Sequence, residues 1–491
     1  MFRRILIANR GEIALRVQRT AKEMGIEVVA VFSEADRNSL HVRFADRAYL
    51  LGPPPPAESY LRGERILEIA QICEVDAIHP GFGFLSENAG FAQAVREAGL
   101  VFVGPPPEAI SRMGDKISSR RVALEAGVPV IPGADADLEP RTLLAKAREI
   151  GFPVLLKAAA GGGGKGIKLV REEGEFEEAF RFAAAEAEGA FGDGRVYLEK
   201  FLDKPRHVEI QVMADRHGGC VTYGERECSV QRRHQKLVEE SPSPAVDPAL
   251  RARMEEAAKR LTLAVGYEGA GTIEFMVSQG EFYFLEMNTR LQVEHAITEE
   301  RFGVDLVAEQ LRIAAGETVR EPWEPRGHSI EVRINAEDPV TFFPSLGTIE
   351  RLSSPGGRGV RFDSAIFRGL EVSPYYDSML AKLIVWAEDR ERAIQRMLRA
   401  LAELRIAGVQ TSVPAAVHVL HSEEFRSGDY DTSILEGLER PQEVQVLEVA
   451  GLAAAYAKYR GALIEDKQET VATGGTGLSP WVLRGRMEGR G

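Results

Sequence analysis

The chain has 491 residues, of which 44% are hydrophobic and 27% are charged, and its formal net charge is −13. This length exceeds the roughly 250–300 residues at which single cores stop growing, so the sequence predicts several domains with the composition of a globular protein. The negative balance argues against a nucleic-acid partner, and the lack of an apolar run of about 18 residues argues against a membrane span.

Strands and helices alternate over the first 113 residues. Residues 3–9 (RRILIAN) are typical of a buried strand, residues 11–25 place apolar side chains at helical spacing, and residues 27–32 (EVVAVF) are typical of the next strand. This order predicts a doubly wound, Rossmann-like α/β domain over residues 1–113, built on a parallel sheet. Its first turn lacks a glycine-rich dinucleotide fingerprint, and its N-terminus lacks the long apolar segment of a signal peptide.

The rest of the chain divides into four predicted segments. Residues 114–130 are a linker helix with a hinge, residues 131–203 a small α/β lid module, residues 204–440 a C-terminal α+β lobe, and residues 441–491 a helical or flexible tail. The three cysteines, Cys73, Cys220 and Cys228, have no C-x-x-C spacing. They therefore offer no zinc site and favour a reducing, cytoplasmic compartment.

A run of glycines lies inside the lid segment, in the stretch KAAAGGGGKGIKLV over residues 157–170. A strand rather than a helix follows it, which argues against a dinucleotide site, and Lys165 is followed by Gly166, which argues against a Walker loop. Two interpretations stay open on this stretch alone. One is a hairpin that covers phosphates, with Lys157 as a point charge, and the other is a flexible turn between strands.

A carboxylate pair further along the chain favours the phosphate interpretation. The turn Ser278-Gln279-Gly280 predicts a hairpin that places Glu274 directly across from Glu286. A period of two predicts one face shared by Phe282, Phe284, Glu286 and Asn288. Opposed carboxylates are destabilising unless a proton or a cation lies between them, and these oxygen ligands suit Mg²⁺ or Mn²⁺. The alternative is a shifted register in which both carboxylates face solvent.

Two flanking stretches supply groups for an anion. Arg290 can form a forked contact with a planar anion, and Glu294 can act as a base beside it, although an ordinary surface ion pair is the alternative. The stretch SVQRRHQK predicts an anion site or a solvated basic face through Gln231, Arg232, Arg233, His234 and Lys236. His207 is either a core histidine or part of this site. Together these residues predict an ATP–Mg²⁺ phosphoryl-transfer site without a Walker motif.

A series of motifs then matches one known family in its order along the chain. The motifs are IANRGEIA, HPGFGFLSEN, MGDK, KAAAGGGGKG, LEKFL, PRHVEIQV, ERECSVQRRHQK, GAGTIEF, FLEMNTRLQVEH, RINAEDP and PYYDSM. The chain resembles biotin carboxylase, the ATP-grasp component of biotin-dependent carboxylases. The resemblance implies an ATP-grasp fold with an N-terminal α/β domain, a mobile lid and a C-terminal mixed lobe, and it places ATP between the lid and the lobe.

The resemblance also implies a role for each motif residue. Nucleotide contacts would come from Lys116, Lys157, Gly163, Gly164, His207, Gln231 and His234, and the adenine edge from Glu199, Lys200, Phe201 and Leu202. Bicarbonate would lie among Lys236, Arg290, Gln292, Val293 and Glu294, with Glu294 as the base. Arg333 would stabilise the enolate form of biotin. Two Mg²⁺ or Mn²⁺ ions would bind with ATP, held by Glu274, Glu286 and Asn288.

The implied chemistry has two steps. Bicarbonate attacks the γ-phosphoryl group of ATP to give carboxyphosphate and ADP, and the ureido nitrogen of biotin then captures the CO₂ that carboxyphosphate releases. The sequence has no Met-Lys-Met biotin-attachment motif, so biotin would arrive on a separate carrier protein. The family further implies a homodimer and a separate carboxyltransferase. The final acceptor, an acyl-CoA or pyruvate, is left open, and the tail over 441–491 would dock a partner.

Two positions depart from the family pattern, and two rival functions remain. Phe82 stands where the family has Tyr, which puts a hydroxyl contact in doubt, and Lys165 stands where it has Arg, which keeps the charge. The main rival is another ATP-grasp ligase that activates a carboxylate or forms a carbamoyl group. The second rival is a nucleotide-binding protein without catalytic activity.

Overall fold

The structure is a computed structural model that describes residues 1–134, 138–158, 167–191, 193–232 and 235–437. Residues Met1–Gly437 form one compact unit. The predicted tail over 441–491 and the candidate residues Gly163, Gly164 and His234 lie outside the described residues.

A five-stranded parallel sheet forms the N-terminal domain, as the alternating pattern predicts, and its strand order is β3-β2-β1-β4-β5. The strands are β1 (Arg4–Ile7), β2 (Glu27–Ser33), β3 (Arg47–Gly52), β4 (Ala77–His79) and β5 (Val101–Phe102). The helices are α1 (Gly11–Glu23), α2 (Leu40–Arg43), α3 (Gly63–Ile72), α4 (Ala89–Glu97) and α5 (Pro107–Gly114), with short 3-10 turns at η1 (Glu34–Asp36) and η2 (Pro56–Glu58).

Alternation along β1 explains why this sheet is covered on both faces. Ile5 and Ile7 pack with Val17 of α1 on one face, whereas Leu6 packs with Ile66 of α3 on the other. A strand buried on both sides must be apolar throughout, which is the pattern of a parallel α/β sheet. The chain then continues through α6 (Lys116–Glu125), whose N-terminus is capped by the Asp115 side chain.

The predicted lid segment forms a separate four-stranded antiparallel sheet in the order β6-β9-β7-β8. Its elements are β6 (Gly133–Ala134), α7 (Pro140–Ile150), β7 (Val154–Ala158), β8 (Ile167–Val170), η3 (Glu173–Glu175), α8 (Phe176–Phe191) and β9 (Val196–Lys200). Strands β7 and β8 pair with Lys157 opposite Ile167, so the glycine run connects two antiparallel strands. A dinucleotide fingerprint joins a strand to a helix, and this connection therefore excludes one here.

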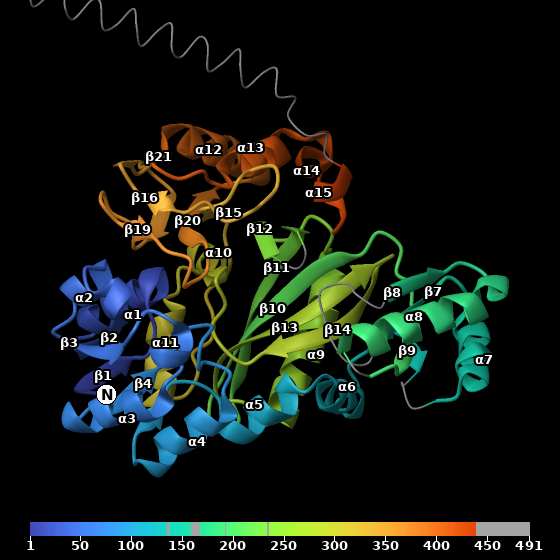
Figure 1. Cartoon of the computed structure of the whole chain (residues 1–491), viewed down its shortest axis with the longest axis horizontal. Helices are drawn as coiled ribbons and strands as arrows, with labels where there is room; N and C mark the ends of the chain where they lie inside the picture. Colours follow the sequence, from blue (N-terminus) through green and yellow to red (C-terminus); the bar gives the residue numbers. More distant parts are fainter. Residues whose placement is uncertain (135–137, 159–166, 192, 233–234, 438–491) are drawn as a thin grey trace, which may run out of the picture. The chain divides into compact units, whose positions relative to one another are not determined.

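An antiparallel sheet of eight strands forms the C-terminal lobe, in the order β14-β13-β10-β11-β12-β15-β20-β18 (Figure 1). The strands are β10 (Arg206–Ala214), β11 (Cys220–Arg232), β12 (Gln235–Ser241), β13 (Gly269–Ser278), β14 (Glu281–Asn288), β15 (His328–Asn335), β18 (Val360–Ser364) and β20 (Met379–Ala387). Two small sheets pair β16 (Gly347–Thr348) with β19 (Glu371–Val372) and β17 (Arg351–Ser353) with β21 (Arg405–Ala407).

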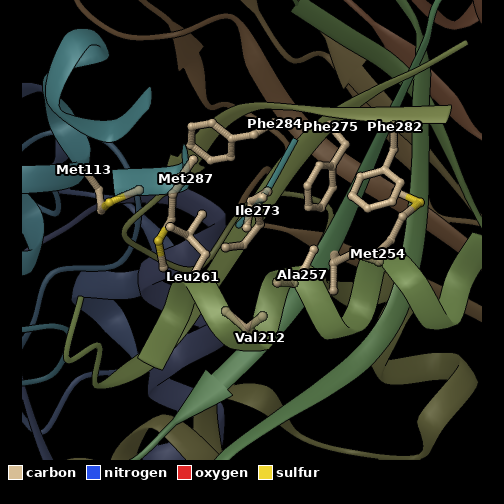
Figure 2. Packing of buried hydrophobic residues seen from close by; sticks show 14 of the residues in the cluster. Met113, Val212, Met254, Ala257, Leu261, Ile273, Phe275, Phe282, Phe284 and Met287 are labelled. Atoms are coloured by element: carbon tan, nitrogen blue, oxygen red, sulfur yellow. The ribbon is translucent and has the colours of Figure 1, made fainter. Parts of the chain in front are cut away.

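Seven helices complete the described part of this lobe. They are α9 (Pro248–Ala264), α10 (His295–Phe302), α11 (Leu306–Ala314), α12 (Arg390–Glu403), α13 (Val413–His421), α14 (Glu423–Ser427) and α15 (Ile434–Gly437). Figure 2 shows Val212, Ile273 and Phe275 of the sheet packed against Met254 and Leu261 of α9. Among the residues that the structure describes, no helix has the length and apolarity needed to cross a membrane.

The β13–β14 hairpin confirms one register prediction and corrects another. Glu274 lies opposite Glu286 as predicted, but Phe275 pairs with Phe284, so Leu285 is an extra residue in β14. This bulge shifts the alternation by one residue. The prediction that Phe282, Phe284, Glu286 and Asn288 share one face is therefore wrong: the two rings lie in the core with α9, whereas Asn288 bonds to Glu274 on the opposite face.

Candidate active site

A row of charged residues crosses the face of the sheet opposite α9. Glu286, Glu274, Glu209 and Arg226 are successive cross-strand partners on β14, β13, β10 and β11. Their strand neighbours, such as Ile273, point into the α9 core because side chains alternate. Three carboxylates in a row repel one another, so the cations around them decide what this face can bind.

Glu274 is the fully compensated member of the acidic pair. Its carboxylate accepts hydrogen bonds from His207 Nε2 (2.7 Å), Asn288 Nδ2 (2.7 Å) and Gln292 Nε2 (2.8 Å), and Lys236 Nζ lies at 3.3 Å. Burial alone would raise the pKa of Glu274, but Lys236 and His207 outweigh burial and lower it well below its usual value. Glu274 is therefore a carboxylate at neutral pH.

Glu286 is the exposed member of the pair. Partial desolvation, and then the negative charge of Glu274, raise the pKa of Glu286, while the positive charges of His207 and Lys116 oppose the rise. The charge on Lys116, the first residue of α6, thus reaches this end of the site. The ionised form of Glu286 is disfavoured beside the ionised Glu274, so a nearby positive charge would stabilise it.

A buried ion cluster forms the other end of the site. Lys236 Nζ lies 2.7 Å from Glu209 and 2.5 Å from Glu294, and Arg333 lies 2.9 Å from Glu294 and 2.6 Å from Glu239. Glu294 is 1% exposed. Burial would raise the pKa of Glu294, but Lys236, Arg333 and Arg226 lower it well below the usual range. The cluster brings together three of the predicted catalytic residues, and the solvated-face interpretation does not hold for Lys236.

The fourth predicted catalytic residue, Arg290, forms a partly exposed ion pair, as the ion-pair alternative predicts. Arg290 Nε donates to Glu87 (2.8 Å), and its NH2 group donates to Asn288 Oδ1 (2.9 Å). Glu87 lies in the N-terminal domain, 203 residues away in sequence. The contact joins the first domain to the site through a half-exposed guanidinium group that an incoming anion can reach.

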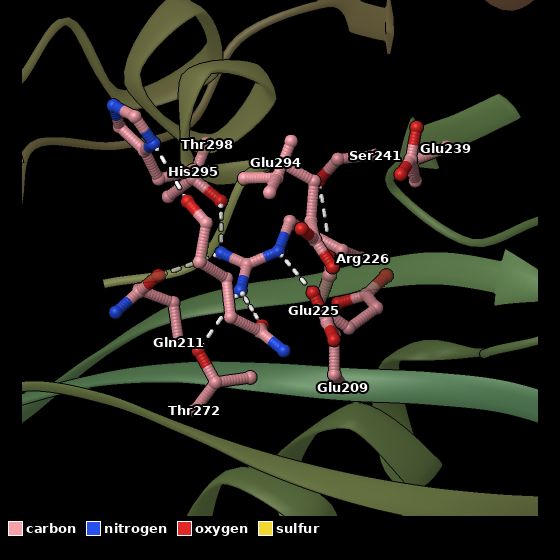
Figure 3. A network of polar contacts seen from close by, with 12 residues as sticks. Glu209, Gln211, Glu225, Arg226, Glu239, Ser241, Thr272, Glu294, His295 and Thr298 are labelled. Carbon is pink, nitrogen blue, oxygen red and sulfur yellow. Dashed lines mark hydrogen bonds and ion pairs between the residues drawn. The ribbon is translucent and has the colours of Figure 1, made fainter. Parts of the chain in front are cut away.

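Arg226 is the structural centre of the buried end, and no motif-based prediction gave it a role (Figure 3). Its side chain is 0% exposed and donates to Glu209, Gln211, Thr272, Gln292 and Thr298 at 2.5–3.0 Å. Gln292 in turn donates to Glu274. Arg226 therefore positions Glu209 directly and Glu274 through Gln292. The signal available in the sequence was an arginine inside a long strand, whose alternation would place it on the polar face.

The residues predicted for the adenine edge lie at the end of β9, in the lid sheet. Lys157 Nζ lies 2.5 Å from Glu199, so the predicted phosphate-binding lysine has a carboxylate partner here. Lys200 Nζ donates to the carbonyls of Gly151 (2.9 Å) and Phe152 (3.3 Å), and the Phe201 N–H donates to Pro153 O (3.2 Å). Leu202 follows directly after the strand, with intermediate exposure.

His207 and Gln231 lie between the two ends. His207 is 6% exposed, and its Nδ1 lies 3.0 Å from Gln231 Nε2 while its Nε2 donates to Glu274. His207 is therefore both buried, as the core interpretation predicts, and bonded to a candidate site residue, as the site interpretation predicts. Val293, also predicted near bicarbonate, directly precedes Glu294 at the start of α10.

The donor set fits a hard divalent cation at the exposed end. Two carboxylates and an amide oxygen are ligands that Mg²⁺ and Mn²⁺ prefer, and the raised pKa of Glu286 indicates that added positive charge is favourable. Two other groupings in the described residues, His207 with Glu209 and Glu274, and Glu209 with Cys228 and Glu294, have closely spaced ligand atoms. The ammonium of Lys236 already neutralises both, so we assign no metal to them.

Three family models match consecutive parts of the chain. Residues 1–110 match the biotin carboxylase N-terminal domain, residues 115–322 the ATP-binding domain of the carbamoyl-phosphate synthase L chain, and residues 331–437 the biotin carboxylase C-terminal domain. Curated relatives include biotin carboxylase of Halalkalibacterium halodurans, which is 52% identical over 89% of this chain and 97% of the relative.

Solved structures agree with these sequence matches. The biotin carboxylase domain dimer of Hydrogenobacter thermophilus 2-oxoglutarate carboxylase, in complex with MgADP, ADP and bicarbonate, superposes with a TM-score of 0.81 at 45% identity, over 90% of this chain and 100% of that chain. The biotin carboxylase component of a pyruvate carboxylase superposes with a TM-score of 0.82 at 46% identity, again over 90% of this chain and 100% of that chain.

Proposed function

The chain belongs to the biotin carboxylase family, and we propose that it carboxylates biotin on a separate carrier protein, using bicarbonate and cleaving ATP to ADP and phosphate. This reaction is the first half-reaction of a multisubunit carboxylase. One related structure holds MgADP and bicarbonate, and another is the biotin carboxylase component of a pyruvate carboxylase.

One observation carries the catalytic assignment: buried Glu294 is held between Lys236 and Arg333. The two cations keep Glu294 ionised, so that it accepts the proton of bicarbonate, and they favour the dianion that results. The freed oxygen then attacks the γ-phosphorus of ATP, and ADP departs. Carboxyphosphate breaks down to CO₂ and phosphate, the released phosphate takes the proton of the biotin ureido N–H, and the ureido nitrogen then captures the CO₂. Arg290 orients bicarbonate, and Arg333 stabilises the biotin enolate.

A bound nucleotide needs cations that neutralise its phosphates and a lid that excludes water from them. Glu274, Glu286 and Asn288 would hold Mg²⁺ or Mn²⁺, which neutralises the charge on the phosphates when bound. Nucleotide contacts are assigned to Lys116, Lys157, Gly163, Gly164, His207, Gln231 and His234, and the adenine edge to Glu199, Lys200, Phe201 and Leu202. Gln292 and Val293 complete the bicarbonate side. The pairing of β7 with β8 supports a glycine hairpin that excludes water from the intermediate.

We divide the chain into a biotin carboxylase N-terminal domain (1–113), a linker (114–130), a lid (131–203), a C-terminal lobe (204–440) and a tail (441–491). The separate lid sheet and its own core, which includes Leu143, Leu156 and Leu198, support the lid assignment. The chain acts with a biotin carrier partner and as a dimer. A separate carboxyltransferase consumes the carboxybiotin, and the tail docks a partner protein. The three free cysteines support a cytoplasmic location.

The test is ATP cleavage by the full chain with Mg²⁺ and bicarbonate. We expect turnover that requires bicarbonate and rises when free biotin is added, with carboxybiotin detected by mass spectrometry. Turnover that requires ammonia or an amino acid instead would favour the rival ATP-grasp ligase. Binding of ATP without any cleavage would favour a nucleotide-binding protein without catalytic activity.

A further inference from the structure

A buried lysine that the mechanism above does not use lies directly behind the bicarbonate side. Lys382 is in β20, is 0% exposed, and pairs across the sheet with Arg333 of β15. Arg333 contacts the side chain of Glu294, whereas Lys382 Nζ donates to the carbonyl oxygen of Val293, the residue before Glu294. Glu294 is thus approached by one cation at its carboxylate and by another at its own backbone.

The ammonium of Lys382 is bonded to this carbonyl rather than closely paired with an acid. Its nearest carboxylate is that of Glu12 in α1, 3.9 Å away, and both Glu12 oxygens lack a hydrogen-bond partner in the described structure. Burial raises the pKa of Glu12 to about 7, and the charge of Lys382 is the main opposing influence. Burial would lower the pKa of Lys382, but the charges of Glu12, Glu331 and Asp363 outweigh burial and raise it. The ammonium therefore stays charged, and its hydrogen bond goes to the Val293 carbonyl.

The bonded carbonyl belongs to the turn that carries three site residues. Arg290, Gln292 and Glu294 all lie within residues 290–294, between the end of β14 and the start of α10. Fixing the Val293 carbonyl fixes the peptide plane that joins it to Glu294, because the peptide bond is planar. The Cα position of Glu294 relative to Lys236 and Arg333 then follows from β20, an interior strand of the sheet.

We propose that Lys382 is a positioning residue that holds the 290–294 turn so that Glu294 and Arg290 converge on bicarbonate. Glu12 of the N-terminal domain supplies the balancing charge together with Glu331 and Asp363 of the sheet. This inference rests on the proposed function, because it assigns Lys382 to the bicarbonate side of that site. It gives a shared purpose to two sequence motifs, IANRGEIA and PYYDSM with its following strand, to which the mechanism assigns no residue.

The test compares the double variant Glu12→Gln/Lys382→Met with Glu12→Gln alone and with the wild type, all as full chains. The double variant removes the Lys382 ammonium together with its nearest carboxylate, so Glu12 is not left as a buried charge without Lys382. At mildly alkaline pH, Glu12→Gln keeps the bond from Lys382 to Val293, and its KM for bicarbonate should stay within about twofold of wild type. The double variant should raise that KM about tenfold or more, since a hydrogen bond from a charged donor is lost, while the KM for ATP changes by less than about twofold.

Each result has a defined meaning. A double variant with the wild-type KM for bicarbonate would overturn the assignment. A double variant that also fails to bind ATP, or that does not fold, would overturn it as well, because Lys382 would then support the whole lobe rather than this turn. A wild type without bicarbonate-dependent ATP cleavage would instead refute the proposed function itself.

Discussion

The two ends of the charged face differ in how their charges are balanced. At the buried end, Glu294 has two close cations, Lys236 and Arg333, and its pKa is lowered. At the exposed end, Glu286 faces Glu274 and has a raised pKa. The buried end is prepared for an anion, which must share the cations that Glu294 already has. The exposed end is prepared for a cation, which it receives from outside. We propose that the exposed end is the metal–nucleotide part of the site and that the buried end is its bicarbonate part.

The largest expected effect comes from removing the charge at the buried end. Glu294→Gln should lower bicarbonate-dependent ATP turnover by about 10²–10⁴-fold, because a general base is lost while the shape is kept. Steady-state assays of ATP cleavage measure the loss, and ATP binding by calorimetry is the control and should be unchanged. Turnover within about threefold of wild type would show that Glu294 is not the base.

Removing Arg226 tests whether the buried end is a single network. Arg226→Met leaves Glu209 and two amides without their guanidinium partner and should lower the free energy of unfolding by about 3–5 kcal/mol. Urea unfolding followed by circular dichroism measures this change. The matched control is Arg253→Met, which breaks an exposed pair with Glu281 and should cost about 0–1 kcal/mol. Equal effects of the two substitutions would argue against the network.

A change at the exposed end should act on metal use and spare the fold. Glu286→Gln removes one ligand charge and should raise the Mg²⁺ concentration needed for half-maximal ATP cleavage by about tenfold or more. Glu281→Gln, on the same strand but paired with Arg253, is the control and should leave magnesium dependence unchanged. The metal assignment fails if both variants respond alike.

The smallest expected effect is a pH dependence confined to the exposed end. Because the folded pKa of Glu286 is raised, its ionisation costs stability as the pH rises through that pKa, and a bound divalent cation relieves the cost. Stabilisation by Mg²⁺ with an ATP analogue, measured as a thermal shift, should therefore decrease by a few-fold in apparent affinity from mildly alkaline to mildly acidic pH. Glu286→Gln should flatten this dependence. A variant as pH-dependent as the wild type would contradict the assignment.

Some of this site follows from local sequence rules, and some does not. The predicted pairing of Glu274 with Glu286 is confirmed, but the turn alone does not produce it: Ser278 pairs with Glu281, and the extra residue Leu285 brings Glu286 opposite Glu274. The strand predicted after the glycine run is confirmed as β8, which pairs antiparallel with β7. The face of Phe284 was predicted wrongly because a strict period of two contains no information about a bulge. Local rules describe regular backbone. The bulge depends on tertiary packing, because it allows both rings to be buried against α9.

Long-range partners were the other limit on prediction. Glu87 meets Arg290 across 203 residues, and Arg226 meets Thr298 across 72. Strands β10 and β11 are buried along most of their length, so charge in them could not be assigned to a solvent face by composition. Family resemblance named Glu294 and Arg333 but gave no role to Arg226, whose importance comes from the number of partners that it joins.

The extra residue Leu285 determines which side chains of β14 reach the charged face. Upstream of it, β14 contributes Phe282 and Phe284 to hydrophobic packing; downstream of it, the same strand contributes Glu286 and Asn288 to the charged face. If Leu285 were paired instead of bulged, it would lie opposite Glu274, and Glu286 would lie opposite Ile273 and turn toward the α9 core. A sequence can therefore retain all the residues of this site and still lose the site through a one-residue slip in strand pairing.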